Sequence, residues 1–192
     1  MQIQRLTTIE EPTNFLIGDK INIDHYTATC QEITPKGALF LMDQYLDKPM
    51  AMNRNNSNKG GYEESDLRRA LQSEDILKIF SCIREWMVPF DNGDLLRIPF
   101  AGEMFGDMLS TWVEPDGHEQ WPLMRDRRNC IASRCGEYEW GWLQNKGITS
   151  STIFCVVDLS GYAAAWDASY VLGVRPAFQI ATYREEAETC HS

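Results

Sequence analysis

The stretch TATCQEITPKGALFLM, residues 27–42, carries the clearest structural signal in the chain. Residues 27–33 alternate polar and apolar side chains, whereas residues 38–42 are continuously apolar. Between them, Pro35, Lys36 and Gly37 supply the residue types of a tight turn. Alternation places one side of the first strand against a core, and the apolar run is typical of a buried strand. The sequence therefore predicts a β-hairpin near the N-terminus.

Further strands are predicted in the last third of the chain. Residues 151–157 are rich in β-branched and apolar side chains, a Ser-Gly pair supplies a turn, and residues 163–166 return beside them. Residues 174–180 complete the pattern. Pro176 falls inside this last segment and has no N–H. We expect it at an edge, at a bulge or where the sheet needs no donor.

The middle of the chain has the spacing of helices that face a core. The apolar positions are Leu67, Ala70 and Leu71, then Ile76, Leu77, Phe80 and Ile83, then Met104, Phe105 and Met108 in a short helix over residues 103–109. Either Ser65 or Asp66 can cap the first helix. Residues 91–94, with the sequence DNGD, lie between two apolar runs and predict another hairpin.

Two segments lack any periodicity and are predicted as long loops. Residues 48–61 are polar and rich in Asn, Ser and Gly. Residues 114–136 contain a tryptophan and an arginine cluster formed by Arg125, Arg127, Arg128 and Arg134. Long aperiodic segments of a compact domain often carry binding residues.

Length and composition indicate one globular domain. The chain has 192 residues, of which 43% are hydrophobic and 24% charged. We expect a single α+β domain over residues 1–192, with an N-terminal hairpin region of about 1–47 and a frayed polar tail at 185–192. Small antiparallel sheets, two main helices and long irregular loops should make up this domain.

The first residues lack the basic start and apolar run of a secretory signal. No stretch reaches the roughly 18 apolar residues of a membrane span. We therefore expect a cytoplasmic protein whose cysteines stay reduced. Cys30, Cys82 and Cys155 have apolar neighbours and are expected to be buried thiols.

The chain is acidic, because 18 Lys and Arg residues against 28 Asp and Glu residues give a net charge of −10. Such a charge repels nucleic acid and anionic membranes and attracts basic surfaces. We expect a protein partner, one that presents a basic nucleic-acid-binding surface, and no direct contact with nucleic acid or membrane. Acidity also keeps a protein in solution, so the charge alone leaves both interpretations open.

Three motifs resemble an uncharacterised domain family of gut bacteria and their phages. They are a Ser-Asp-Leu-Arg helix start at 65–68, a Trp-Gly-Trp-Leu segment at 140–143 and a Gly-Val-Arg-Pro-Ala ending at 173–177. The resemblance covers about residues 60–180. The chain departs from the family pattern at Gly141, which separates the tryptophans, and at Gln144, where the family usually has Arg.

The ending also resembles C-type-lectin-like folds of the branch that contains formylglycine-generating enzymes and the variable proteins of phage diversity-generating systems. This resemblance implies an irregular ligand-binding surface on small antiparallel sheets flanked by two helices. We expect Arg175 to be paired inside the fold with a carboxylate or with backbone carbonyls. At least one of Trp140 and Trp142, which share a strand face, should belong to the core.

Metal and catalytic patterns are missing. The histidines are far apart and have no zinc-type spacing, and Cys130 and Cys135 form at most a weak half-site. Glu114-Pro115-Asp116 and Trp166-Asp167 only partly match the calcium motifs of C-type lectins. No nucleophile elbow and no phosphate-binding glycine loop occurs. We expect no metal and no cofactor, and the cysteine motif of formylglycine-generating enzymes does not align.

Long loops and several tryptophans favour recognition over catalysis. We expect a non-catalytic phage- or prophage-type binding protein, an acidic inhibitor of a host nucleic-acid-handling protein of the anti-CRISPR kind. One alternative is a virion-borne adhesin or receptor-binding module for a cell-surface protein or sugar. Another is an enzyme that uses a cysteine or a carboxylate.

The residues expected to carry these roles fall into two groups. Candidate binding residues are Trp112, Glu114, Asp116, Trp121, Tyr138, Trp142, Tyr162 and Trp166. Candidate structural residues are Arg68, Trp140, Arg175 and Pro176.

Overall fold

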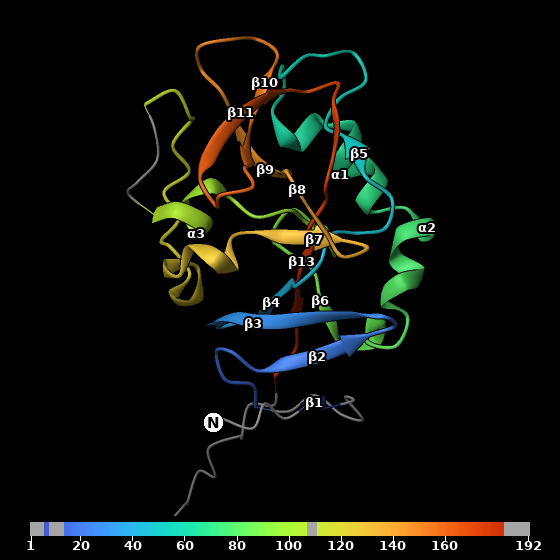
Figure 1. The fold of residues 1–192 in the computed structure, drawn as a ribbon. Coiled ribbons are helices and arrows are strands. Elements are labelled where there is room, and N and C mark those ends of the chain that lie inside the picture. Colours follow the sequence, from blue (N-terminus) through green and yellow to red (C-terminus); the bar gives the residue numbers. More distant parts are fainter. Residues whose placement is uncertain (1–5, 8–13, 107–110, 183–192) are drawn as a thin grey trace, which may run out of the picture.

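The structure is a computed structural model that describes residues 6–7, 14–106 and 111–182. Within these residues the chain combines short helices with small, mostly antiparallel sheets, as expected for an α+β fold. Figure 1 shows a larger sheet in the lower half of the molecule, a smaller sheet at the top and helices on both flanks. The expected tail at 185–192 lies outside the described residues.

The larger sheet has the strand order β1-β2-β3-β4-β13-β6. All neighbouring strands in it are antiparallel except β1 and β2. The strands are β1 (Leu6–Thr7), β2 (Lys20–Ile23), β3 (Tyr26–Thr34), β4 (Gly37–Met42), β6 (Met87–Val88) and β13 (Ala177–Ile180).

The hairpin predicted from residues 27–42 is confirmed as β3 and β4. The two strands close at Thr34 opposite Gly37, and a bulge follows Cys30. Gly37 has a φ of 153°, and a Cβ there would lie 2.1 Å from the Ile180 carbonyl oxygen. Only glycine fits where this turn meets β13.

Both faces of β4 are buried, which explains its unbroken apolar run. Ala38, Phe40 and Met42 belong to a larger core cluster, whereas Leu39 and Leu41 belong to a second one. Because successive strand side chains point to opposite faces, the sheet separates the two clusters. The larger cluster also contains Phe80, Trp142 and Phe178, and the smaller one contains Met104, Trp121 and Cys155.

β13 is a central strand, with β4 on one side and β6 on the other. Pro176 directly precedes β13, and its carbonyl oxygen accepts a hydrogen bond from the Met42 N–H at 3.0 Å.

The turn at 91–94 is present, but the predicted hairpin around it is wrong. Arg97 bridges Ala177 and β6 pairs with the far end of β13, so the two arms pair with β13 and not with each other.

The smaller sheet has the order β11-β10-β9, and two separate ribbons pair β12 with β5 and β7 with β8. The predicted return of residues 163–166 beside 151–157 is confirmed by the β10–β11 pair. The strands are β9 (Gly141–Lys146), β10 (Ile153–Val157), β11 (Ala163–Asp167), β5 (Met50–Ala51), β12 (Val171–Leu172), β7 (Ala132–Arg134) and β8 (Glu137–Glu139).

The described helices are shorter than expected. α1 (Asp66–Leu71) begins after Ser65, whose hydroxyl oxygen accepts a hydrogen bond from the Arg68 N–H at 3.0 Å. The second apolar stripe is buried as predicted, although it is divided among α2, η2 and the residues that follow. The remaining elements are α2 (Glu74–Leu77), α3 (Ala101–Phe105), η1 (Tyr62–Glu64), η2 (Lys78–Phe80), η3 (Arg84–Trp86), η5 (Pro122–Arg125) and η6 (Arg127–Asn129). Met104 and Phe105 are buried in α3, and Met108 lies outside the described residues.

Gly141 of the Trp-Gly-Trp-Leu segment and Gly173 of the Gly-Val-Arg-Pro-Ala ending both pack against Tyr45. A Cβ on Gly141 would lie 2.3 Å from the Tyr45 hydroxyl oxygen, and a Cβ on Gly173 would lie 2.7 Å from its ring. The segments pair with each other, because the Trp142 N–H donates to the Gly173 carbonyl oxygen at 3.1 Å. The buried tyrosine therefore accounts for glycine at both positions.

Both predicted structural arginines, Arg68 and Arg175, are tied into the fold. The Arg175 Nε donates to the Met42 carbonyl oxygen at 2.6 Å, and Nη1 donates to the Asn129 carbonyl oxygen at 2.9 Å. The expected pairing with backbone carbonyls is confirmed. Arg68 binds Asp94 through Nε at 2.6 Å and so joins α1 to the turn at 91–94.

The two predicted loops are only partly surface loops. Met52, Asn53 and Asn58 of the first are buried, as are Trp121, Met124 and Cys130 of the second. Asn58 explains part of this burial, because its Nδ2 donates to carbonyl oxygens of the segment between β9 and β10.

Cys30 and Cys155 are buried as expected, but Cys82 is exposed because it lies outside the buried stripe of its segment.

Candidate binding groove

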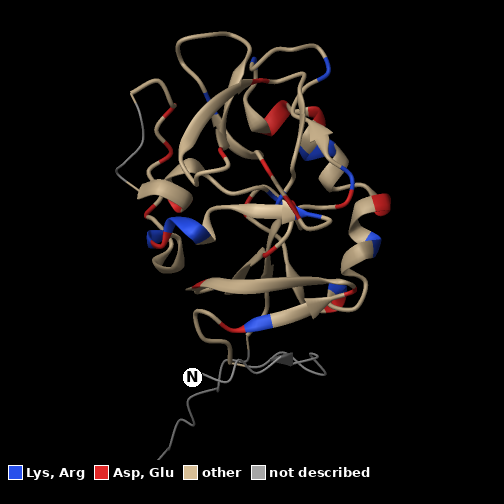
Figure 2. Cartoon of the chain, viewed as in Figure 1, with Lys and Arg blue, Asp and Glu red and all other residues tan. Residues whose placement is uncertain are grey.

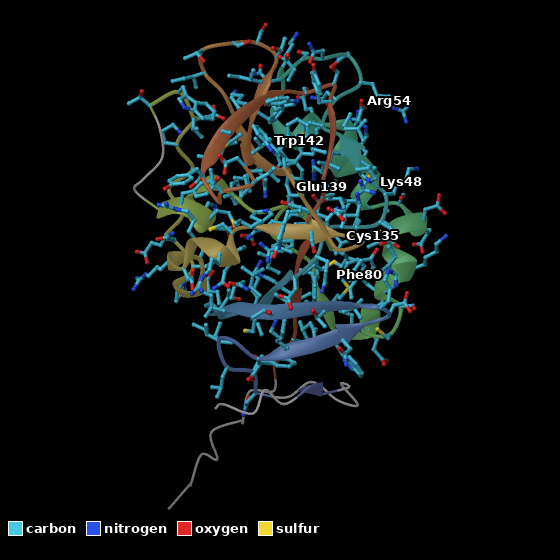
Figure 3. The ribbon with its side chains drawn as sticks, in the orientation of Figure 1. Lys48, Arg54, Phe80, Cys135, Glu139 and Trp142 are labelled. Carbon is cyan, nitrogen blue, oxygen red and sulfur yellow. The ribbon has the colours of Figure 1, made fainter. Side chains whose placement is uncertain are left out.

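A groove of about 480 Å³ lies where the smaller sheet and the two ribbons meet. We call it the aromatic groove because four aromatic side chains line it. Its lining residues are Pro49, Arg134, Tyr138, Glu139, Trp140, Leu159, Trp166, Tyr170, Val171 and Leu172. In Figure 1 the β7–β8 ribbon lies between the larger sheet and β11, and Figure 3 labels Glu139 in this region.

Short strands position these side chains. Tyr138 and Glu139 belong to β8, and Trp140 follows at the start of the path into β9. Trp166 belongs to β11, and a turn closed by the Tyr170 N–H to Asp167 carbonyl hydrogen bond (3.0 Å) leads into β12. Residues far apart in the sequence therefore meet because three small sheets converge.

The aromatic rings support one another. The ring centroids of Trp140 and Trp166 are 4.6 Å apart at 64°, and those of Trp166 and Tyr170 are 5.4 Å apart at 80°. Both arrangements are edge-to-face contacts, which aromatic pairs prefer. Trp140 and Trp166 also pack against the larger core cluster, so the groove has a floor anchored in the core.

Exposed apolar surface is concentrated at this groove. Tyr138 is 69% exposed, Val171 59%, Tyr170 54% and Leu159 51%. The other exposed large apolar side chains of the described residues, such as Leu16, Ile33 and Ile148, lie outside the groove. Single exposed apolar residues are ordinary, whereas a gathered patch marks a site of interaction.

The polar groups of the groove leave one hydrogen-bond donor unused. Arg134 and Glu139 form an ion pair in which the Arg134 Nε donates to the Glu139 Oε2 at 2.9 Å, and this hydrogen bond to Glu139 raises the pKa of Arg134. These charges cancel. The indole N–H of Trp166 is buried and has no acceptor among the described residues. A groove with this lining attracts apolar groups.

Three strands beside the groove have one edge without a ladder partner among the described residues. β11 ends its sheet, β8 pairs only with β7, and β12 pairs only with β5, within the described residues. Unpaired strand edges present backbone donors and acceptors that an extended segment can bind.

Charges elsewhere are intermixed over the described residues. Figure 2 shows acidic and basic segments next to one another, above all along the helices on the right flank. Many of them pair, as in the ion pairs of Arg68 with Asp94, Arg69 with Asp66 and Arg84 with Glu74. The net acidity is therefore not gathered at the aromatic groove.

The structure brings together only some of the candidate binding residues. Tyr138 and Trp166 line the aromatic groove, joined by Trp140, which the sequence suggested as structural. Tyr162 is exposed outside the groove, where the Arg127 guanidinium lies 3.6 Å from its ring centroid. Trp112 packs against the smaller core cluster.

Two expectations for tryptophans need correction. Trp121 and Trp142 are 2% and 1% exposed and offer no contact surface. The Trp121 indole N–H donates to Glu32 at 3.2 Å, and that of Trp142 donates to the Met50 carbonyl oxygen at 2.8 Å. Both side chains belong to the core, and the single polar group of each is satisfied within the protein.

Glu114 and Asp116 lie in a different depression from the aromatic groove. The Asp116 carboxylate accepts hydrogen bonds from the Gly102 N–H and the Asn145 Nδ2, both at 2.8 Å. Glu114 pairs with Lys146 at 3.2 Å. Asp116 therefore holds α3 to β9, a role that a turn-forming Asp-Gly pair did not suggest.

Catalytic groups are not assembled at the groove. Burial raises the pKa of the Cys155 thiol to about 12 and that of Cys130 to about 11, which keeps both thiols protonated near neutral pH. A buried ion pair joins Arg97 to Glu103, with Nη1 to Oε2 at 2.7 Å, in another depression beside His118. Glu103 also accepts the Phe100 N–H at 2.8 Å, so this carboxylate is committed to fixing the start of α3.

No cluster of His, Cys, Asp and Glu side chains suited to a metal ion occurs in the described part of the chain. Over the same residues, every helix is too short or too polar to cross a bilayer. No family model, curated protein or solved structure matches the chain.

Proposed function

We propose that this chain is a non-catalytic binding protein whose aromatic groove holds an extended segment of a partner protein. The observation that carries the proposal is the gathering of four exposed apolar side chains around one groove of about 480 Å³. Clustered aromatic anchors supply most of the binding energy in many protein interfaces.

An extended peptide suits the groove better than a compact ligand. The open edges of β8, β11 and β12 offer backbone hydrogen bonds to a strand-like segment. An apolar side chain of that segment would pack between Tyr138 and Tyr170. The rings of Trp140, Trp166 and Tyr170 already contact one another, so these side chains lose little conformational entropy on binding.

We further propose that the partner carries a basic surface. The net charge of −10 favours encounter with such a protein at low salt. Within this class, an acidic inhibitor of a nucleic-acid-handling protein, acting in the cytoplasm of a bacterial host, remains our first proposal. A virion-borne adhesin for a cell-surface protein or sugar is the second, because aromatic side chains also bind sugars.

The proposed ancestry follows the motifs of the sequence. We propose a relationship to the gut-bacterial and phage domain family and to C-type-lectin-like folds. The packing of Tyr45 against Gly173 supports it, since it explains the glycine that begins the Gly-Val-Arg-Pro-Ala ending.

Retention of partners on immobilised protein tests this proposal. Wild type is compared with the double variant Tyr138→Ser/Tyr170→Ser, and with Ile148→Ser as a matched control that removes an exposed apolar side chain outside the groove. Bacterial lysate, intact cells and glycans are each applied at low and high salt. We expect wild type and the control to retain the same protein and the double variant to lose it.

The salt dependence separates the two proposed classes. Loss of a basic intracellular protein at high salt supports the inhibitor, and salt-insensitive binding to cells or glycans supports the adhesin. Equal retention by all three proteins would exclude the groove as the contact site.

A further inference from the structure

A second cavity, of about 340 Å³, opens between the larger sheet and the segment that contains η6. Its charged and amide lining comes from Lys20, Gln31, Asp43, Arg128, Asn129 and Arg175. None of these residues lines the aromatic groove, so the two sites are distinct. We call this cavity the Arg175 pocket.

Arg175 is a buried cation without an anionic partner. Its side chain donates from Nε to the Met42 carbonyl and from Nη1 to the Asn129 and Cys130 carbonyls, while Nη2 makes no hydrogen bond to a described residue. Arg175 forms no ion pair within the described residues, and burial lowers the pKa of its guanidinium. Buried charges are normally paired, so this one is a candidate to receive an anion.

The other charges around the pocket are already paired. Lys20 Nζ lies 2.7 Å from Asp43, and Arg128 lies 2.7 Å from Asp126. Each pair sums to zero, which leaves the single positive charge of Arg175. In a chain with a net charge of −10, a pocket with a net positive lining is a local exception.

A second unpaired group lies in the same pocket. Gln31 is almost fully buried and donates from Nε2 to the Thr29 carbonyl oxygen at 3.1 Å, but its Oε1 has no partner. A ligand that accepts from Arg175 and also donates to Gln31 would complete both groups. A protonated phosphate oxygen or a hydroxyl next to a carboxylate has this combination.

We propose that the Arg175 pocket binds a small oxyanion, a phosphate or a carboxylate. Nη2 of Arg175 donates to the anion, and Lys20 and Arg128 lie on the pocket wall to strengthen its field. The volume suits a small molecule or a single side chain. Because of the unpaired Gln31 oxygen, we expect phosphate to bind more tightly than acetate.

Isothermal titration of the whole chain with inorganic phosphate and, separately, with acetate tests the proposal, with glycerol as a neutral control. Saturable binding of phosphate identifies a phosphate-type ligand, and saturable binding of acetate alone identifies a carboxylate. Saturation by neither anion would overturn the proposal.

Charge variants link the binding to this pocket without removing Arg175, whose loss endangers folding. Lys20→Met should weaken anion binding about tenfold, because it removes a cation and leaves Asp43 facing the ligand. Lys78→Met is the matched control, since Lys78 also pairs with an aspartate, Asp75 at 3.4 Å, but lies outside the pocket.

Asp43→Asn should act in the opposite direction. It removes the only carboxylate of the pocket lining and frees Lys20, so the anion should bind several-fold more tightly. Weaker binding in Lys20→Met together with tighter binding in Asp43→Asn supports the site. Equal affinity in wild type, Lys20→Met and Asp43→Asn would show that the anion binds elsewhere and would overturn the assignment.

Discussion

The indole rings of Trp140 and Trp166 meet edge to face with their centroids 4.6 Å apart. This contact joins the path into β9 to β11 and fixes the floor of the aromatic groove. Trp142, two residues further along, has its indole inside the core and bonded to the Met50 carbonyl. Trp140 and Trp142 therefore have different roles: Trp140 lines the groove, whereas Trp142 is part of the core, where its indole N–H is hydrogen-bonded.

Replacing these tryptophans by phenylalanine should have unequal effects on folding. Trp142→Phe loses a buried hydrogen bond and leaves a cavity, so we expect it to lower the free energy of unfolding by about 2–4 kcal/mol. Trp166→Phe removes an N–H that has no acceptor in the described residues, and we expect a change within about 1 kcal/mol. Urea unfolding of both variants measures the difference. A larger cost for Trp166→Phe would mean that its N–H is satisfied.

Arg175→Lys should destabilise the chain although the charge is kept. The lysine ammonium lacks the planar fork that reaches the carbonyls of Met42 and Asn129, so we expect a loss of about 3 kcal/mol in the free energy of unfolding. Arg128→Lys, at an exposed arginine near the same segment, is the control and should unfold like wild type. Equal stability of the two variants would refute the structural role of Arg175.

The thiols should differ sharply in reactivity. Burial raises the pKa of Cys30 and Cys155 to about 12 and that of Cys130 to about 11, whereas Cys82 and Cys135 are exposed. In a Cys190→Ser background, a thiol reagent at neutral pH should label Cys82 and Cys135 in the native protein. The buried thiols should react only after denaturation, and mass spectrometry identifies the labelled positions. Rapid native labelling of Cys155 would reopen the cysteine-enzyme alternative.

The contribution of Asp43 to stability should disappear in acid. Burial alone raises the pKa of this carboxyl, but hydrogen bonds from Lys20, Thr29 and Thr27 outweigh burial and lower the pKa below its ordinary value. A lowered pKa in the folded state stabilises the protein above the ordinary value of about 3.9, and this contribution is lost as the pH falls through the folded pKa.

Unfolding of wild type and Asp43→Asn over a pH series checks this expectation. The variant should be less stable at pH 7, and the difference should narrow below about pH 4. A difference that stays constant down to pH 2 would show that the ionised state of Asp43 does not matter.

Local signals allowed much of the fold to be predicted from the sequence. The β3–β4 hairpin, the β10–β11 pair and the Ser65 cap each rest on residues close together in the chain. The hairpin around residues 91–94 was wrong because β13, far along the chain, offers both arms a partner. A short stretch of sequence does not show whether a strand will pair with its neighbour or with a distant strand.

The groove was only partly predictable. Tyr138 and Trp166 were expected to bind, but Leu159, Tyr170 and Val171 reach the groove only because separate ribbons converge. The exposure of a tryptophan depends on tertiary packing, so Trp121 and Trp142 could not be told from Trp166 by residue type. The alternation of Tyr138 with polar neighbours was the one sequence signal for an outward aromatic side chain.

Selection of extended peptides tests the aromatic groove most directly. A random peptide library is displayed on phage and selected on wild type, and the dissociation constant of each enriched peptide is then measured for wild type, Tyr138→Ser and Ile148→Ser. We predict enriched peptides with a central apolar residue, at least tenfold weaker binding by Tyr138→Ser, and unchanged binding by Ile148→Ser. Equal affinities for all three proteins, or the absence of any enriched peptide, would contradict the account.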